Sequence, residues 1–378
     1  MASAPLAAGA GVPSQRREKT APASYTAELT EGFSAHIVRW QKSHGRHSLP
    51  WQNTRDPYRV WLSEIMLQQT QVATVLDYYT RFLQRFPVVA DLAAAPLDDV
   101  LGLWSGLGYY SRARNLHRCA QDVVRLHGGQ FPQSAELLQT LPGIGPSTAA
   151  AIASFCFFER VAILDGNVKR VLTRVTAFSG DLASSAQERA LWEIATTLLP
   201  SRNLVDNMSR YTQGVMDLGA TICTTRQPSC LLCPVQAMCR GRAGGTPETY
   251  PVKTRKLKRS AQSLSLLWAE RRDGSVWLER RAAPGIWGGL YCFPVFGSEE
   301  DLLAALPVPW QGRLAAVQPF VHVLTHKDLR LSPMVLALSA REAKTAGLPG
   351  AGAWFARDAW EGLGLPAPIR KLLQQRQG

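Results

Sequence analysis

Residues 141–148 read Leu-Pro-Gly-Ile-Gly-Pro-Ser-Thr and lead directly into the alanine-rich segment 149–153. Gly143 and Gly145 permit a tight turn that leaves backbone N–H groups exposed. The segment after the turn is predicted to be a helix, and a helix presents the positive end of its dipole at its N-terminus. This stretch therefore predicts a site that binds an anion such as phosphate.

A second helix is expected before the turn, at residues 134–140, so the whole stretch matches the helix-hairpin-helix motif. An ordinary turn between two helices is the alternative. The charge of the chain favours the first interpretation, because 42 Lys and Arg against 29 Asp and Glu give a net charge of +13. Such an excess favours a polyanionic partner, either nucleic acid or an acidic membrane surface. No window approaches the ~18–20 uninterrupted apolar residues of a membrane span.

The 378 residues are enough for about two domains. Residues 1–29 have no secretory signal pattern and are expected to be a disordered tail, which favours a cytoplasmic location. Residues 30–240 are expected to form a helical core. Residues 241–260 are strongly basic and predict a linker, and residues 261–378 are expected to form a small α+β domain.

Apolar residues recur at helical spacing in much of the core. These patterns predict helices over residues 58–86, 113–126, 147–158, 168–178 and 185–199. In the C-terminal part the period changes to two, and an Asp273-Gly274 turn predicts a β-hairpin. Residues 313–323 and 328–338 predict two more strands.

Four of the seven cysteines follow the pattern C-x6-C-x2-C-x5-C. They are Cys223, Cys230, Cys233 and Cys239. In a chain without an export signal, clustered thiols indicate metal binding rather than disulfides. Zinc and a 4Fe–4S cluster both accept four cysteine ligands. The spacing resembles the iron–sulfur loop of the endonuclease III superfamily, and this resemblance favours the 4Fe–4S cluster.

Two carboxyl groups are candidates for acid–base chemistry. Glu64 lies on a strongly apolar helix, where burial would raise its pKa and suit it to act as a general acid. Asp165 begins a helix, and a capping Asp stays ionised. One protonated and one charged carboxyl suit cleavage of a glycosidic bond. The structural alternatives are a buried, paired acid at Glu64 and a plain helix cap at Asp165.

Together these segments resemble the MutY-type adenine DNA glycosylases. The matching text covers residues 33–239 and lies at 49–51, 57–61, 63–72, 106–110, 141–148, 164–171 and the cysteine loop. The resemblance implies a mainly α fold: a helix-hairpin-helix glycosylase core with an iron–sulfur loop, split into two lobes around a cleft. It also implies a C-terminal α+β Nudix-like domain.

The resemblance implies that Glu64 protonates the adenine and that Asp165 stabilises the sugar at C1′. Asn167 is implied as a partner of that centre. Ser147 stands where some relatives have Tyr and where lyases have a Lys nucleophile. Little or no lyase activity is therefore expected, with Lys169 a weak alternative Schiff-base former.

The same resemblance implies the remaining contacts. The adenine pocket should contain Leu49, Trp51, Gln52 and Gln213. The strand that carries 8-oxoguanine should meet Gln69, Thr70, Leu107 and Tyr109, with Tyr109 as the wedge. Gly143 and Gly145 of the hairpin should contact the DNA backbone.

In the C-terminal part, residues 277–294 resemble the start of a Nudix domain. The acidic cluster that a Nudix hydrolase uses to hold Mg²⁺ is missing, so the fold is expected without the hydrolase. Relatives check for 8-oxoguanine with a Phe-Ser-His loop. Thr325 and His326 match the last two residues of that loop, and Leu324 replaces the aromatic residue.

The expected function is therefore base excision repair of double-stranded DNA: a monomeric, nucleoid-associated enzyme that releases adenine mispaired with 8-oxoguanine or guanine and leaves an abasic site. A pyrimidine-specific bifunctional glycosylase is the rival enzyme, and Ser147 argues against it. A non-catalytic iron–sulfur DNA-binding protein is the rival from another class, and the Glu64 and Asp165 pair argues against it.

Overall fold

The computed structural model describes residues 27–254, 258–345 and 347–376. The tail expected at residues 1–29 lies outside the described residues except for 27–29, which are the first residues of helix α1. Among the described residues, no helix is long and apolar enough to cross a membrane.

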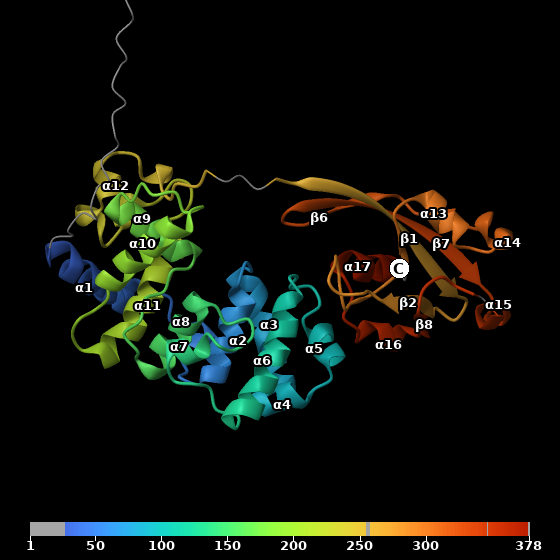
Figure 1. Ribbon diagram of the computed structural model, residues 1–378, viewed down its shortest axis with the longest axis horizontal. Helices are drawn as coiled ribbons and strands as arrows, with labels where there is room; N and C mark the ends of the chain where they lie inside the picture. Colours follow the sequence, from blue (N-terminus) through green and yellow to red (C-terminus); the bar gives the residue numbers. More distant parts are fainter. Residues whose placement is uncertain (1–26, 255–257, 346, 377–378) are drawn as a thin grey trace, which may run out of the picture.

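The first part of the chain is helical, and its helices form two groups (Figure 1). They are α1 Ala27–His44, α2 Pro57–Leu67, α3 Val72–Arg85, α4 Val89–Ala94, α5 Leu97–Leu103, α6 Ser111–His127, α7 Ala135–Leu138, α8 Pro146–Phe157, α9 Gly166–Thr176, α10 Ser185–Thr197, α11 Leu204–Thr221 and α12 Arg240–Ala243, with short 3-10 turns at Pro50–Gln52, Cys230–Leu232, Gln236–Met238 and Pro247–Thr249.

Each group has its own hydrophobic core. Helices α2–α8 enclose one core, whose largest fully buried side chains include Trp61 and Trp104. Helices α1 and α9–α11 enclose the other, which contains Phe33 and Val171. Helix α8 contributes to both, because its small residues let helices on either side pack closely.

The single helix expected over residues 58–86 is wrong, because it is broken between α2 and α3. Gln69 adopts a left-handed φ of 57° in this break. A non-glycine residue in that conformation has no sequence signal, since glycine is the usual indicator. The break is positioned instead by contacts from elsewhere in the chain.

The C-terminal part is a mixed sheet with helices (Figure 1). The strands are β1 Ser260–Arg271, β2 Val276–Arg280, β3 Tyr291–Cys292, β4 Val295–Phe296, β5 Ala315–Ala316, β6 Phe320–Val323, β7 Lys327–Leu338 and β8 Gly352–Phe355, and the helices are α13 Glu299–Ala304, α14 Val308–Gln311, α15 Ala340–Thr345, α16 Arg357–Glu361 and α17 Ala367–Gln375.

Strand β1 lies in the middle of this sheet. It pairs in parallel with β7 along its whole length, from Ser260 to Arg271. The predicted hairpin is present as the antiparallel β1–β2 pair, with Gly274 at φ 80° in its turn. The single strand expected over residues 313–323 is instead two strands, β5 and β6. Pro319 lies between them, and its missing N–H interrupts a ladder.

The sheet and its helices, the described residues of 260–376, are called the sheet unit below. The sheet unit contacts the turn between α5 and α6. Ser105 Oγ donates a hydrogen bond to the Leu365 carbonyl at 3.1 Å, and Arg370 Nε donates to the same hydroxyl at 3.0 Å. Tyr110 OH also donates to the Leu365 carbonyl, at 2.9 Å. An ion pair joins Arg280 to Asp98 at 2.8 Å. These contacts fix the sheet unit against the group of helices α2–α8.

The contact between the sheet unit and helices α2–α8 can be tested at Gly102. A Cβ on Gly102 would lie 2.2 Å from the Gly362 carbonyl oxygen, so we expect Gly102→Ala to separate the two surfaces at a cost of roughly 1–3 kcal/mol, as for other overpacked positions. Hydrogen exchange at residues 362–365 should increase. Gly312→Ala is the control, because a Cβ there meets no atom within 4 Å. Unchanged exchange in both variants would contradict this assignment.

Candidate active site

A cleft of about 1380 Å³ opens at the surface of the helical part. Residues from both groups of helices line it, and ten of the residues singled out in the sequence are among them. These ten are Leu49, Trp51, Gln52, Glu64, Gln69, Thr70, Ser147, Asp165, Asn167 and Gln213. The structure therefore brings together residues that lie as much as 164 positions apart, from Leu49 to Gln213 (213 − 49).

Glu64 is carried on α2, among side chains that are mostly buried. Burial, together with the smaller effect of the nearby charge of Asp165, raises its pKa from 4.5 to about 7. No hydrogen bond or ion pair to another described residue stabilises its charged form. Glu64 is therefore a carboxyl group that holds a proton near neutral pH.

Asp165 is the N-cap of α9 and accepts a hydrogen bond from the Val168 N–H at 2.7 Å. Burial raises its pKa, but the N–H groups of Val168 and Asn167 and the charges of Arg170 and Lys169 oppose this rise. Such bonds stabilise the ionised form. The pKa of Asp165 therefore also lies above its usual range, but these bonds and charges limit the rise, and Glu64 has no such stabilising groups in the described chain.

Two further side chains on the cleft have fixed partners, and a third has an amide nitrogen that is unpaired within the described ranges. Ser147 Oγ accepts from the Leu164 N–H at 3.0 Å. Asn167 Oδ1 accepts from Arg170 Nη2 at 2.8 Å. Gln52 Nε2 is buried without a hydrogen-bond partner among the described residues, so it is a donor that remains available to a ligand.

Sequence reasoning missed a buried ion pair behind Gln213. Asp217 is fully buried and pairs with Arg46, whose Nη2 lies 2.6 Å from Asp217 Oδ1. Gln213 Nε2 donates to the same oxygen at 2.9 Å. An acid four residues after Gln213, in an apolar stretch of helix, was the available signal, because buried acids need partners.

Arg170 was missed as well, and it joins the cleft to the cysteine loop. Besides Asn167, its guanidinium donates to the carbonyls of Gly219 at 2.6 Å and Cys223 at 2.7 Å. A change in the shape of the cysteine loop would therefore alter the position of Asn167 through the Arg170 side chain that bonds both.

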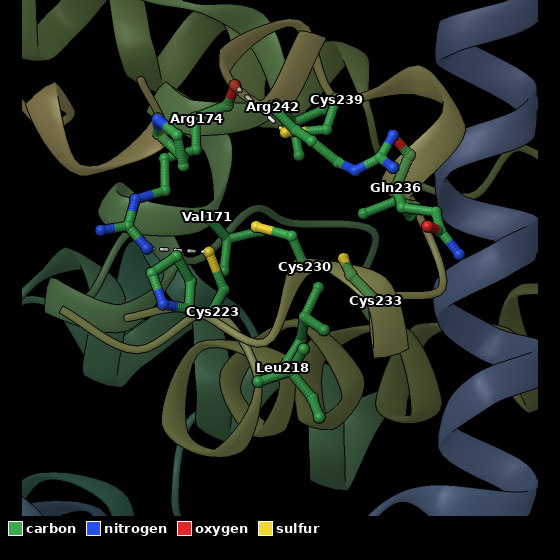
Figure 2. A pocket seen from close by; sticks show the side chains of 14 residues that line it. Val171, Arg174, Leu218, Cys223, Cys230, Cys233, Gln236, Cys239 and Arg242 are labelled. Carbon is green, nitrogen blue, oxygen red and sulfur yellow. Dashed lines mark hydrogen bonds between the residues drawn. The ribbon is translucent and has the colours of Figure 1, made fainter. Parts of the chain in front are cut away.

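The four cysteines line a second cavity, shown in Figure 2. It contains about 370 Å³ of space free of protein atoms, part of it open to solvent. Arg174 Nη1 lies 3.3 Å from Cys223 Sγ. Within the described ranges, no three Cys, His, Asp or Glu side chains converge closely enough to hold one metal ion.

The other predicted residues lie outside the cleft. Tyr109 is 42% exposed, and its hydroxyl contacts Thr325 Oγ1 of the sheet unit. His326 is the neighbour of Thr325, in the turn between β6 and β7. Leu107 is buried in the core of α2–α8, so its side chain is covered in this structure.

The two hairpin glycines lie just before α8. Gly145 is the N-cap of this helix. Gly143 has φ 78°, and a Cβ there would lie 2.7 Å from Asn115 Cβ, so glycine is required by both conformation and space. The predicted turn and helix start are therefore present, with the two glycines outside the cleft and Ser147 and Thr148 lining it.

Known proteins resemble this chain in both its helical part and its C-terminal part. Residues 62–196 match the family described as HhH-GPD superfamily base excision DNA repair protein, and residues 266–375 match the NUDIX domain. The chain is 36% identical to the adenine DNA glycosylase of Buchnera aphidicola subsp. Acyrthosiphon pisum, over 90% of this chain and 97% of that protein. The chain belongs to the adenine DNA glycosylase family. It is thus a DNA N-glycosylase, an enzyme of base excision repair.

The mouse adenine DNA glycosylase is also 36% identical, over 93% of this chain and 80% of that protein. A solved thermostable thymine-DNA glycosylase is similar over 56% of this chain and 96% of its own, with 29% identity and a TM-score of 0.49. The two family matches confirm the predicted fold class, a helical helix-hairpin-helix core followed by a Nudix-like domain.

The raised pKa of Glu64 has a consequence for stability. Since its pKa is 4.5 ordinarily and about 7 here, the folded chain binds more protons than the unfolded chain between these values. Stability therefore falls as pH rises through this window. We expect the uncharged Glu64→Gln variant to be more stable than the natural chain at pH 8, by roughly 1–3 kcal/mol, and equally stable near pH 4.5.

Thermal or urea unfolding at the two pH values measures this difference. Glu193→Gln is the control, because Glu193 is exposed on α10 and should show no such difference. A Glu64→Gln variant that is less stable at pH 8 would show that Glu64 is a paired structural acid.

Proposed function

We propose that this chain hydrolyses the N-glycosidic bond of adenine mispaired with 8-oxoguanine or guanine in double-stranded DNA, leaves an abasic site, and acts as a monomer. The pair of Glu64 and Asp165 carries the proposal, because both line one cleft, Glu64 has a pKa raised to about 7, and Asp165 has backbone N–H groups and cations that favour its charged form. The names of the similar proteins support adenine as the leaving base.

The two carboxyls divide the chemistry. The bond from C1′ to the base breaks and its electron pair goes to the base, which receives the proton of Glu64. Asp165 stabilises the positive charge that remains on the sugar. Water then adds its oxygen to C1′ and gives up a proton, which restores Glu64. Gln52 Nε2, with no partner of its own, is available to hydrogen-bond the base.

The contacts around the cleft support a reaction without strand cleavage. A lyase needs a free amine that attacks the sugar. Ser147 supplies a hydroxyl at that position, and it is bound to the Leu164 N–H. The Lys169 ammonium is paired with Glu188. Lys253 lines the cleft from the segment after α12, so it is the amine to examine if borohydride traps a covalent complex.

The cysteine cavity supports a 4Fe–4S cluster as the resident cofactor. Four thiols from one loop face it, and their C-x6-C-x2-C-x5-C spacing resembles that of the iron–sulfur loop of the endonuclease III superfamily. Cys223, Cys230, Cys233 and Cys239 would hold the cluster, with Arg174 beside Cys223 to balance negative charge. When bound, the cluster would fix the shape of this loop.

The contact between Tyr109 and Thr325 supports recognition of 8-oxoguanine by the sheet unit. It places the Thr325 hydroxyl and its neighbour His326 next to an exposed aromatic ring of the helical part. 8-Oxoguanine differs from guanine by the C8 oxygen and the N7 hydrogen, so polar groups are needed to distinguish them. Nucleoid association would follow from DNA binding.

Single-turnover assays on a duplex with one 8-oxoguanine:adenine pair test the chemistry. We expect Glu64→Gln to lose at least roughly 10²–10⁴-fold in rate, the usual contribution of a general acid, while it still binds the duplex. Asp165→Asn should also be inactive but folded, because the amide oxygen can still cap α9. Because Glu64 must be protonated, the rate of the natural chain should fall above about pH 7.

Glu193→Gln is again the matched control and should keep full activity. Release of a pyrimidine, or strand cleavage without alkali, would favour the bifunctional rival. Duplex binding without any base release would favour a non-catalytic protein.

Metal analysis of protein purified without oxygen tests the cofactor. We expect iron and sulfide in the natural chain and their loss from Cys230→Ser, because three remaining thiolates hold the cluster poorly. Cys119→Ala should keep its iron, since Cys119 is buried in the core of α2–α8. One zinc and no iron in the natural chain would overturn the assignment.

The double variant Thr325→Ala with His326→Ala tests lesion recognition. We expect the preference for 8-oxoguanine:adenine over guanine:adenine to weaken by roughly 1–3 kcal/mol, as for a lost base-edge contact, with little change on guanine:adenine itself. The ratio of single-turnover rates on the two duplexes measures this. An unchanged ratio would mean that the sheet unit does not read the lesion.

A further inference from the structure

Arg112 lies between two loops, the first of which lines the cleft. One loop, residues 68–71, joins α2 to α3, and the other, residues 106–110, precedes α6. Arg112 is the second residue of α6 and is only 8% exposed. A buried guanidinium needs partners for its N–H groups, so these partners show what Arg112 holds in place.

Toward the first loop, Arg112 contacts the end of α2. Its Nη1 donates to the carbonyls of Ile65 at 2.8 Å and Met66 at 2.9 Å. Its Nη2 donates to Thr70 Oγ1 at 3.2 Å. The last carbonyls of a helix lack intrahelical partners and carry the negative end of its dipole. These two carbonyls therefore offset the positive charge of Arg112, which forms an ion pair with no carboxylate of the described chain.

Toward the second loop, the same Nη2 donates to the carbonyls of Leu107 at 3.1 Å and Gly108 at 3.3 Å. The guanidinium carbon lies 5.6 Å from the centre of the Tyr109 ring and 5.2 Å from that of Trp104. One planar group thus bonds to both loops at once, in a way that depends on its rigid fork.

Each loop contains one non-glycine residue with a left-handed backbone. Gln69 has φ 57° and Tyr109 has φ 47°. Such conformations are unfavourable for residues that carry a side chain and persist only where surrounding contacts impose them. Both side chains are exposed, so the contacts that impose them act on the backbone. Arg112 bonds the residue next to each of them, Thr70 after Gln69 and Gly108 before Tyr109.

We propose that Arg112 is a positioning residue that fixes Gln69 and Tyr109 relative to each other, so that both side chains enter the mispaired duplex together. This inference rests on the proposed function, which assigns both residues to DNA. Arg112 touches neither the base nor the carboxyls in this scheme. It acts on the opening of the duplex, which precedes bond cleavage.

Arg112→Lys tests the inference, because a lysine keeps the charge but offers its donors from one point. Two substrates are compared: a duplex with an 8-oxoguanine:adenine pair between matched neighbours, and the same pair between two mismatches. The mismatches loosen the stack, so less wedging is needed to extrude the adenine. We expect the single-turnover rate to fall roughly 10- to 100-fold on the matched duplex, as for two or three lost hydrogen bonds, and less than roughly threefold on the loosened one.

Two control variants separate this effect from others. Arg114→Lys changes an arginine two residues further along α6 that bonds the Gly288 carbonyl instead of either loop, and it should reduce neither rate. Glu64→Gln should reduce both rates equally, because it affects the chemical step. If the natural chain released no adenine from either duplex, the proposed function would fail, which differs from any outcome for Arg112.

Equal losses on the two duplexes, or no loss on either, would overturn the positioning role. If Arg112→Lys does not fold, Thr70→Val and Thr70→Ser decide, since Thr70 Oγ1 accepts from Arg112. Thr70→Val should lose several-fold more on the matched duplex than on the loosened one, and Thr70→Ser should restore the natural ratio. Identical behaviour of the two Thr70 variants would then reject the inference.

Discussion

The active-site cleft depends on one costly arrangement, the burial of Glu64 beside Asp165. Two carboxyls in one cleft cannot both ionise easily. The chain resolves this by giving them unequal surroundings. Asp165 sits at the start of α9, where backbone N–H groups and the helix dipole stabilise a negative charge. Glu64 has no such donors among the described residues, and its pKa is raised to about 7.

This asymmetry explains much of the surrounding architecture. The small residues of α8 let the two groups of helices approach closely enough for the carboxyls of α2 and the start of α9 to line one cleft. The hairpin before α8 places Ser147 at the same cleft, where its hydroxyl fixes the segment that ends in Asp165. Glu64, Ser147 and Asp165 therefore all lie on a helix or at its start.

The sequence predicted the parts of this site that rely on local chemistry. Gly143, Gly145 and Pro146 indicate a turn and a helix start, and Asp165 indicates a cap, because these residue types have strong local preferences. The break at Gln69 and the division of the expected strand at Pro319 were missed. The left-handed backbone of Gln69 is imposed by distant contacts. The division of the strand did have a local signal, the proline at position 319, but the alternating apolar pattern around it obscured that signal. Asp217 and Arg112 were missed because their partners lie far away in sequence.

Buried arginines also change how the charge of +13 is to be understood. Arg112 and Arg174 are almost fully buried, and both donate to backbone carbonyls of loops instead of facing a polyanion. Arg170 does the same between Asn167 and the cysteine loop. Part of the cationic excess is therefore structural: it organises the segments that are proposed to touch DNA. Net charge alone indicated the partner, but the positions of these arginines show that part of a cationic excess can hold loops and helix ends in place instead of facing a polyanion.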